Sequence, residues 1–371
     1  MPKDLDETYG LPPRSSTEEK SAPPLPYEPM DPESYRPRIG LIGCGGISIQ
    51  HLRAYRDAGY DVAILCDRTE EKARDAQKKF YPEAAVCTDF RDVLRRDDIQ
   101  VVDLAAHPGD RASMYGPAID AGKHILSQKP FVTDIDFGSR IVERAEKRGV
   151  RLAVNQNGRW APHWSWIRQA ITAGLLGEVT SVRTAVNWDH NWVAGTAAGD
   201  DPWLTLFDFG IHWFDIVSCF MGSRVPVRVY ASTARAPTQR ARPPLLSQAL
   251  VEYEEGQAEL FFDANTLFGE RDCTFVAGTR GAASSEGPDL NVQSVTLATA
   301  EGRARPALTG KWFPDGFHGT MGELLCAVEQ KREPLNSARN NLKSLELCFA
   351  AIASASAHAP VAPGSVRKLR D

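Results

Sequence analysis

The sequence predicts an α/β protein in two parts: an N-terminal Rossmann dinucleotide-binding domain and a C-terminal α+β domain with a large, mostly antiparallel open sheet. Three observations support this fold class. At 371 residues the chain is longer than one typical domain. Short apolar runs alternate with helical stretches over residues 38–158, whereas several strands follow one another later in the chain. All eight tryptophans stand at or after Trp160, so the two parts differ in composition.

The alternation in the first part predicts right-handed crossovers and a parallel sheet covered on both faces. The predicted strands are RIGLIG (38–43), DVAILCD (61–67), VCTD (86–89), QVVDLAA (100–106), HILSQKP (124–130) and RLAVNQN (151–157). The predicted helices between them cover residues 51–59, 70–80, 90–97, 110–122 and 141–149.

The second part, residues 159–371, reads as a substrate-binding and oligomerisation domain. Strands are predicted at 179–190, at four places within 227–278, and at 292–299. Their spacing by turn-rich loops is typical of an antiparallel sheet. Helices are predicted over 163–173, 208–221, 319–331 and 338–357.

Residues 1–37 contain nine prolines and few branched aliphatic side chains, so they belong to neither core. Two interpretations stay open for this arm: a disordered tail, or an extended segment lying across the protein or a neighbouring subunit. Tyr27 and Tyr35 would anchor the extended form.

The composition excludes several classes of protein. A net charge of -5 provides no positive field for nucleic acid, and no apolar run is long enough to span a membrane. The N-terminus lacks the basic and apolar regions of a signal peptide, and the seven scattered cysteines never form a CxxC pair. The eight histidines show no metal-ligand spacing either. We therefore expect a cytoplasmic protein with reduced thiols and no metal.

A glycine-rich turn follows the first predicted strand, in the sequence GCGGIS. Gly43, Gly45 and Gly46 stand where a tight turn must bring the backbone close to a pyrophosphate at the start of a helix. Asp67 ends the second strand, 22 residues after Gly45, where a carboxylate accepts hydrogen bonds from the adenosine ribose. That carboxylate would repel the extra phosphate of NADP, and Arg68 would offset this in part, so NAD is the expected cofactor.

Two further segments predict a catalytic group. Lys129 of SQKP lies at the carboxyl end of a predicted parallel strand, the edge where open α/β sheets bind ligands. In LFDFGIHWFDIV, Asp208, His212 and Asp215 are spaced by four and three residues, which places them on one face of a continuous helix. A histidine satisfied inside the core is the alternative for His212.

These segments together resemble the glucose-fructose oxidoreductase, inositol dehydrogenase and rhizopine-catabolism (Gfo/Idh/MocA) family over residues 38–357. The resemblance rests on GCGGIS with Asp67, AGKHILSQKP, NGRWAP, DFGIHWFD and the closing PLNSARNNLKSLELCFAAIASA. The sequence departs from the family at Gln128, where a glutamate is usual, and at the pair His107-Pro108, where Thr-Pro is common.

The resemblance implies an NAD-dependent dehydrogenase acting on the CH–OH group of a small polyol or sugar. It assigns His212 as general base, Lys129 as the hydrogen-bond donor to the developing alkoxide, and Asp208 as the residue that orients His212. The expected cofactor contacts are Gly43, Gly45, Gly46, Ile47, Asp67, Arg68, Ala106, His107, Gln128, Lys129 and Asn157.

The tryptophan-rich half suits a sugar, because an indole face packs on sugar C–H groups and its N–H binds a hydroxyl. The expected substrate contacts are Arg159, Trp160, Trp188, Asp189 and His318, with residues 189–203 as a loop over the site. No tight Lys/Arg cluster accompanies these residues, which favours a neutral substrate.

Three functions remain open. The first is a sugar, glycoside or cyclitol dehydrogenase, with oxidation at C3 of a glucosyl unit as the preferred instance and inositol as another substrate. The second is a glycosidase-like lyase that uses transient oxidation. The third is a non-catalytic NAD(H)-sensing protein, which the presence of Lys129, Asp208 and His212 disfavours. We also expect a homodimer or homotetramer formed through the strands at 248–278.

Overall fold

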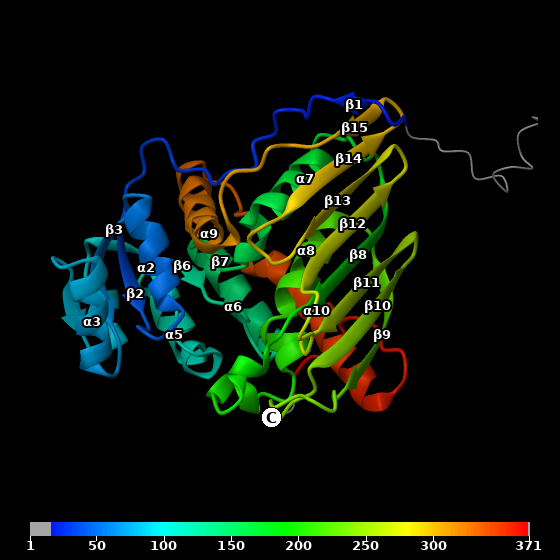
Figure 1. Cartoon of the computed structure of the whole chain (residues 1–371). Helices are drawn as coiled ribbons and strands as arrows, with labels where there is room; N and C mark the ends of the chain where they lie inside the picture. The colour runs from blue at the N-terminus through cyan, green and yellow to red at the C-terminus, as the bar shows by residue number, and fades with distance from the viewer. Residues whose placement is uncertain (1–15, 370–371) are drawn as a thin grey trace, which may run out of the picture.

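The structure is a computed structural model and describes residues 16–369. It contains two sheets that lie side by side (Figure 1). One sheet has six strands and the other has nine. The predicted fold class is confirmed: a parallel Rossmann sheet precedes a large, mostly antiparallel one.

The six-stranded sheet has the order β4-β3-β2-β5-β6-β7, and every pair in it is parallel. Its strands are β2 (Arg38–Ile42), β3 (Asp61–Cys66), β4 (Ala85–Cys87), β5 (Ile99–Leu104), β6 (His124–Ser127) and β7 (Leu152–Val154). The connecting helices are α2 (Ser48–Asp57), α3 (Glu70–Phe80), α4 (Phe90–Leu94), α5 (Pro108–Asp120) and α6 (Ile135–Arg148). Helix α6 begins six residues before the predicted start, because the Asp134 carboxylate accepts a hydrogen bond from the Phe137 N–H and caps it there.

The nine-stranded sheet has the order β1-β15-β14-β13-β12-β8-β11-β10-β9. Its strands are β1 (Glu19–Lys20), β8 (Val179–Asn187), β9 (Pro226–Ala234), β10 (Leu246–Tyr253), β11 (Gly256–Asp263), β12 (Arg271–Gly278), β13 (Gly281–Gly287), β14 (Ser294–Thr299) and β15 (Gly302–Ala304). Two pairs are parallel, β8 with β11 and β1 with β15, and the others are antiparallel.

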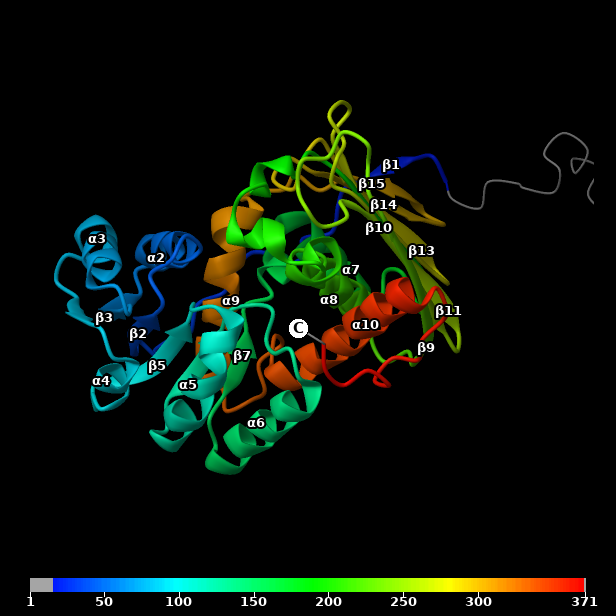
Figure 2. The same ribbon diagram turned by 90° about the horizontal axis from the view of Figure 1, so that it is seen from below.

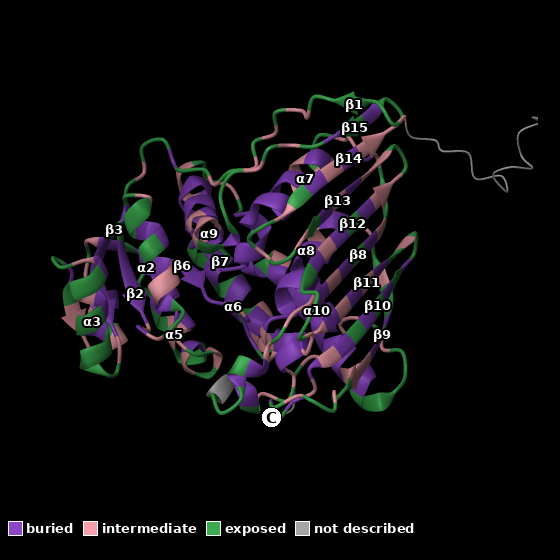
Figure 3. Cartoon of the chain, in the orientation of Figure 1, coloured by how far each residue is buried: buried purple, intermediate pink, exposed green. Residues whose placement is uncertain are grey.

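Helices cover one face of this sheet and leave the other open (Figure 2). The helices of the second part are α7 (Pro162–Thr172), α8 (Ile211–Met221), α9 (Trp312–Glu329) and α10 (Ala338–Ala357). Alternate residues along β10 are buried and exposed, as expected for a strand with one covered face (Figure 3).

Helix α9 crosses from the second part of the chain to the first. It packs against α2, and its side chains Phe317, Met321 and Leu324 belong to the core of the six-stranded sheet. The two sheets are therefore tied together by a helix from the C-terminal part of the sequence.

The described residues of the proline-rich arm, 16–37, run in extended form across the second part toward α2 and α9 (Figure 1). Strand β1 pairs with β15, and the Tyr27 hydroxyl contacts the Thr309 hydroxyl at 3.1 Å. The Glu329 carboxylate accepts hydrogen bonds from the N–H groups of residues 33–35. Tyr27 and Tyr35 both pack on the core, and the remainder of the arm, residues 1–15, lies outside the described residues.

Candidate active site

The glycine-rich turn forms one wall of a cavity of about 600 Å³ at the carboxyl ends of β2, β3 and β5. Gly43 has φ of 102°, a left-handed conformation that favours glycine, and a Cβ there would clash with the backbone at Ala106. At Gly45 and Gly46 a Cβ would meet nothing within 4 Å. Within the described part of the chain, the N–H groups of Gly45, Gly46 and Ile47 donate no hydrogen bond. Free N–H groups at the start of α2 suit a pyrophosphate.

Asp67 lines the same cavity, next to the glycine-rich turn. Its Oδ2 accepts a hydrogen bond from Cys44 N at 2.8 Å and its Oδ1 accepts one from Thr69 N at 2.9 Å. Each carboxylate oxygen keeps a lone pair for a ribose hydroxyl. Arg68, Ala106 and His107 also line the cavity. The residues present therefore fit a dinucleotide, with the pyrophosphate at the turn and the adenosine at Asp67.

Lys129 follows β6, two residues after the strand ends, and its ammonium group binds Asp208 twice. Lys129 Nζ lies 2.7 Å from the Asp208 carbonyl oxygen and 3.0 Å from its Oδ1. That carbonyl is available because the first backbone bonds of α8 are accepted by Phe209 and Gly210 instead. Burial would raise the pKa of Asp208, but the Lys129 charge and hydrogen bond hold it below its usual range.

The structure corrects the expectation of one continuous helix over 208–221. Asp208 ends a short π-helix, Leu204–Asp208, and α8 begins only at Ile211. Asp208 therefore faces Lys129, while Asp215 faces away from it toward Arg159. No hydrogen bond joins Asp208 to His212 among the described residues, so Asp208 acts on His212 through its charge.

His212 lies in the first turn of α8 and is 8% exposed. Its ring lies edge-on to Trp312, with the centroids 5.5 Å apart, and its buried Nδ1 has no hydrogen-bond partner in the described part of the chain. Burial and the nearby Lys129 charge lower the pKa of His212 to about 3. The imidazole is therefore neutral near pH 7, as a proton acceptor must be.

A buried polar network of Gln128, His51, Asp103 and Asn155 contacts the main chain of Lys129. Gln128 Oε1 accepts a hydrogen bond from Lys129 N at 2.6 Å, and the Gln128 amide nitrogen lies 3.3 Å from His51 Nε2. His51 Nδ1 lies 2.7 Å from Asp103 Oδ2, and Asn155 contacts both His51 and Gln128. Because a carboxylate only accepts hydrogen bonds, His51 Nδ1 carries the proton and Nε2 receives the two amides.

Aromatic rings lie beside Asp208. His190 stacks on Trp188 with centroids 5.3 Å apart, and it contacts Phe209 at 4.9 Å and the exposed Trp192 at 4.8 Å. Burial lowers the pKa of His190 to about 4. Asp189 organises this loop, because its Oδ1 accepts hydrogen bonds from the main-chain and side-chain nitrogens of Asn191.

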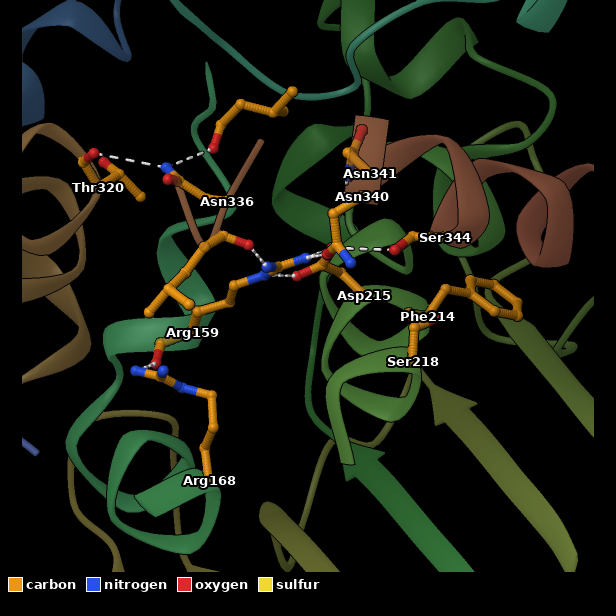
Figure 4. Close-up of polar contacts among 12 residues, drawn as sticks. Arg159, Arg168, Phe214, Asp215, Ser218, Thr320, Asn336, Asn340, Asn341 and Ser344 are labelled. Carbon is orange, nitrogen blue, oxygen red and sulfur yellow. Dashed lines mark hydrogen bonds and ion pairs between the residues drawn. The ribbon is translucent and has the colours of Figure 1, made fainter. Parts of the chain in front are cut away.

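The structure places Arg159 away from this group. Its guanidinium is buried, binds both carboxylate oxygens of Asp215 at 2.6 and 2.7 Å, and also contacts the Leu335 carbonyl and Asn340 (Figure 4). With these donors engaged and its side chain 4% exposed, Arg159 holds Asp215 and is not brought together with Lys129, Asp208 and His212 as expected of a substrate contact.

Three other expected residues also lie elsewhere. His318 binds Asp31 of the arm at 2.9 Å, and with Trp160 it lines a separate cavity of about 280 Å³ beneath the arm. Asn157 accepts a hydrogen bond from Trp312 Nε1 at 3.0 Å and does not line the cofactor cavity. His318 and Trp160 lie beneath the arm and Asn157 lies against Trp312, and these tertiary neighbours cannot be read from sequence spacing.

The structure adds residues that the sequence did not single out. Asp201, in the loop before the π-helix, is half-buried, and burial together with the Asp208 charge raises its pKa. His51, Asp103 and Asn155 were also unassigned. Among the described residues, no group of three His, Cys, Asp or Glu side chains could hold a metal ion, and no helix is long and apolar enough to cross a membrane.

Comparison with protein families gives two matches. Residues 37–156 match the oxidoreductase family model described as an NAD-binding Rossmann fold (GFO_IDH_MocA). Residues 164–284 match the GFO/IDH/MocA C-terminal domain. The first match covers the six-stranded sheet, and the second covers β8 to β12 and the start of β13 in the nine-stranded sheet.

Individual relatives agree with this assignment. The D-apiose dehydrogenase of Paraburkholderia graminis is 27% identical over 351 residues, covering 85% of this chain and 86% of that protein. The inositol 2-dehydrogenase of Burkholderia multivorans is 26% identical, covering 79% of this chain and 94% of that protein. The crystal structure of an oxidoreductase domain protein from Kribbella flavida superimposes with a TM-score of 0.78 at 21% identity, covering 89% of this chain and all of that one.

Proposed function

This chain belongs to the GFO/IDH/MocA family of oxidoreductases, and from that membership we propose that it oxidises a secondary hydroxyl of an uncharged sugar, glycoside or cyclitol. NAD serves as the hydride acceptor. The observation that carries the proposal is the Lys129–Asp208 pair beside a neutral, buried His212, at the same sheet edge as the dinucleotide cavity.

The proposed roles follow from the contacts. Two hydrogen bonds from Lys129 go to Asp208, which leaves one N–H of the ammonium group for the substrate oxygen. That hydrogen bond stabilises negative charge on the oxygen as the C–H bond breaks. His212 takes the hydroxyl proton, and the Asp208 charge stabilises the imidazolium that results. When bound, NAD supplies the electrophilic carbon that accepts the hydride.

The aromatic group formed by Trp188, His190, Trp192 and Phe209 supports a carbohydrate substrate. Such rings pack on the C–H face of a sugar, and Trp188 Nε1 is buried without a partner in the described chain. Asp208 carries negative charge here and is already paired with the Lys129 ammonium group, which disfavours a phosphorylated substrate. The two relatives described above, an apiose dehydrogenase and an inositol dehydrogenase, are named for substrates of this class. Oxidation at C3 of a glucosyl unit is our preferred instance.

A panel of sugars, glycosides and cyclitols tests the proposal, with NADH formation as the readout and NADP as the competing cofactor. We expect Lys129→Met and His212→Gln each to lower kcat by at least about 100-fold on the best substrate. Lys343→Met, an exposed lysine on α10, is the matched control and keeps full activity. Aglycone release without NADH formation would favour the lyase instead. Activity that survives both active-site substitutions would contradict either reaction.

We also propose that the open face of the nine-stranded sheet joins two copies of the chain. This face exposes the apolar side chains Val227, Tyr230, Leu250 and Phe275 on β9, β10 and β12. Exposed apolar patches of this kind are typical of subunit contacts. Light scattering on the wild type and on Leu250→Lys tests it: a wild-type dimer or larger assembly that dissociates in the variant supports the proposal, and a wild-type monomer contradicts it.

A further inference from the structure

Two cysteines end neighbouring strands at the adenosine side of the cofactor cavity. Cys66 is the last residue of β3, Cys87 is the last residue of β4, and the two are register partners in the parallel sheet. Register partners on adjacent strands lie about 5 Å apart at Cα, which falls within the range that a disulfide bridges.

Their side chains lie on the same face of the sheet. Both belong to the apolar cluster that contains Val93 and Leu94 of α4, whereas Cys44 belongs to the cluster on the opposite face. The Cys87 thiol donates a hydrogen bond to the Asp89 carbonyl at 3.6 Å, and the interaction between the two thiols lowers the pKa of Cys87 and raises the pKa of Cys66. Cys44 is therefore not the natural partner of either thiol.

The pair differs in access. Cys87 is half-buried on β4, the edge strand of the sheet, so a small oxidant reaches it from solvent. Cys66 is 2% exposed and lines the dinucleotide cavity. An accessible thiol beside a buried one is the arrangement in which the second thiol resolves oxidation of the first.

The backbone of both cysteines holds the cofactor site. The Cys66 carbonyl accepts a hydrogen bond from Gly43 N at 2.8 Å, and the Cys87 carbonyl accepts one from Asp67 N at 3.3 Å. The residues after Cys87, Thr88 and Asp89, line the cavity as well. Movement of either cysteine therefore moves the glycine-rich turn or the carboxylate that faces the ribose.

We propose that Cys66 and Cys87 form an oxidation-sensitive dithiol whose conversion to a disulfide weakens dinucleotide binding. Hydrogen peroxide is the oxidant: it converts the Cys87 thiolate to a sulfenic acid and releases hydroxide. The Cys66 sulfur then attacks the Cys87 sulfur, the S–O bond breaks, and water leaves with the Cys66 proton. The bond links the two strand ends whose carbonyls hold the Gly43 and Asp67 N–H groups, and the effect on dinucleotide binding acts through these two contacts. The proposal rests on the dinucleotide site of the proposed function.

The test treats the reduced full-length protein with hydrogen peroxide and follows two readouts. Peptide mapping under non-reducing conditions is expected to join the Cys66 and Cys87 peptides, and a thiol reductant is expected to separate them. NADH titration by fluorescence is expected to give a Kd at least about threefold higher after oxidation, restored by the reductant. Prior addition of NAD is expected to slow the disulfide, since linkage makes the two effects reciprocal.

Cys87→Ser is the main variant, because its half-buried position tolerates the change, and Cys273→Ser on β12 is the matched half-buried control. The first variant is expected to keep its NADH affinity after peroxide, and the second to lose it as the wild type does. A map without the Cys66–Cys87 link, or a disulfide that leaves NADH affinity unchanged, would overturn the proposal. Reduced protein that fails to bind NADH would instead contradict the proposed function, while the peptide map still decides whether the disulfide forms.

Discussion

Asp208 contacts Lys129 through both its main chain and its side chain, and the two contacts do different things. The carbonyl hydrogen bond positions the ammonium group, whereas the carboxylate supplies a negative charge. That charge opposes the Lys129 charge at His212, where burial and Lys129 lower the pKa and Asp208 raises it. Asp208 is therefore the charge that favours the protonated form of His212, against burial and Lys129.

Asp208→Asn separates these two effects, because asparagine keeps the size and the main-chain contact but loses the charge. We expect kcat to fall by about 10- to 100-fold with little change in KM, since the charge matters most when His212 becomes protonated. Steady-state kinetics on the best substrate of the panel measure both constants. Asp57→Asn, on the exposed end of α2, is the matched control. A variant that loses affinity but keeps kcat would show that Asp208 binds substrate instead.

Gln128 is the residue at which the sequence departs from its family, and its surroundings explain why an amide fits there. His51 Nδ1 donates to Asp103, so His51 Nε2 must accept, and the Gln128 amide nitrogen provides the donor. A carboxylate at position 128 would offer only acceptors toward that nitrogen.

We therefore expect Gln128→Glu to lower the melting temperature, because it would bury a carboxylate that has no donor to offer His51 Nε2. Differential scanning calorimetry measures the shift. Gln128→Leu is the control for lost hydrogen bonds without added charge, and it is expected to cost less stability. An unchanged melting temperature in the glutamate variant would mean that the network rearranges around position 128.

At the level of secondary structure, the Arg159–Asp215 pair joins three elements that are distant in sequence. Arg159 belongs to the 3-10 helix Asn157–Trp160, Asp215 belongs to α8, and Ser344 of α10 donates to Asp215 at 2.9 Å (Figure 4). Both charged side chains are almost fully buried, so each depends on the other for its solvation.

Asp215→Asn leaves the Arg159 charge buried without a counter-charge. We expect a loss of about 3 kcal/mol or more in unfolding free energy, and a melting temperature lower by several degrees. Differential scanning calorimetry measures the shift, and NADH binding by the surviving folded protein shows whether the cofactor site remains. Asp120→Asn, which breaks an exposed pair with Arg144, is the control and should change little. Equal effects of the two substitutions would show that the buried pair stabilises no more than a surface pair.

The sequence predicts which strands and helices carry the candidate site residues, but not where each helix begins or breaks. All six strands of the parallel sheet and α10 lie where the pattern indicates, because apolar runs and helical periodicity are local signals. The break before α8 leaves no mark in the periodicity: helical spacing continues through Gly210, and only the folded chain shows that a Cβ there would clash with the Thr205 carbonyl. The partners of Arg159 and His318 cannot be predicted from sequence for a different reason, since Asp215 and Asp31 reach them only through tertiary contacts.

In the molecule as a whole, burial of neutral histidines ties stability to pH. Burial lowers the pKa of His212 and His163 to about 3, and of His124 and His190 to about 4. These four histidines are distributed over both parts of the protein, so we expect acid to destabilise both parts. Asp272 works in the opposite sense, because burial raises its pKa to about 7.

Below pH 6.5 the unfolded chain protonates each of these histidines while the folded chain does not, so unfolding takes up protons and stability falls as pH falls. Each histidine contributes up to about 1.4 kcal/mol per pH unit between pH 6.5 and its folded pKa, and four outweigh the single opposing carboxyl of Asp272. We therefore expect the melting temperature to drop steeply between pH 6.5 and 4. Calorimetry across that range measures the slope. His163→Gln removes one titrating group that lies far from Lys129, so a variant with a slope as steep as the wild type would contradict this origin of the acid sensitivity.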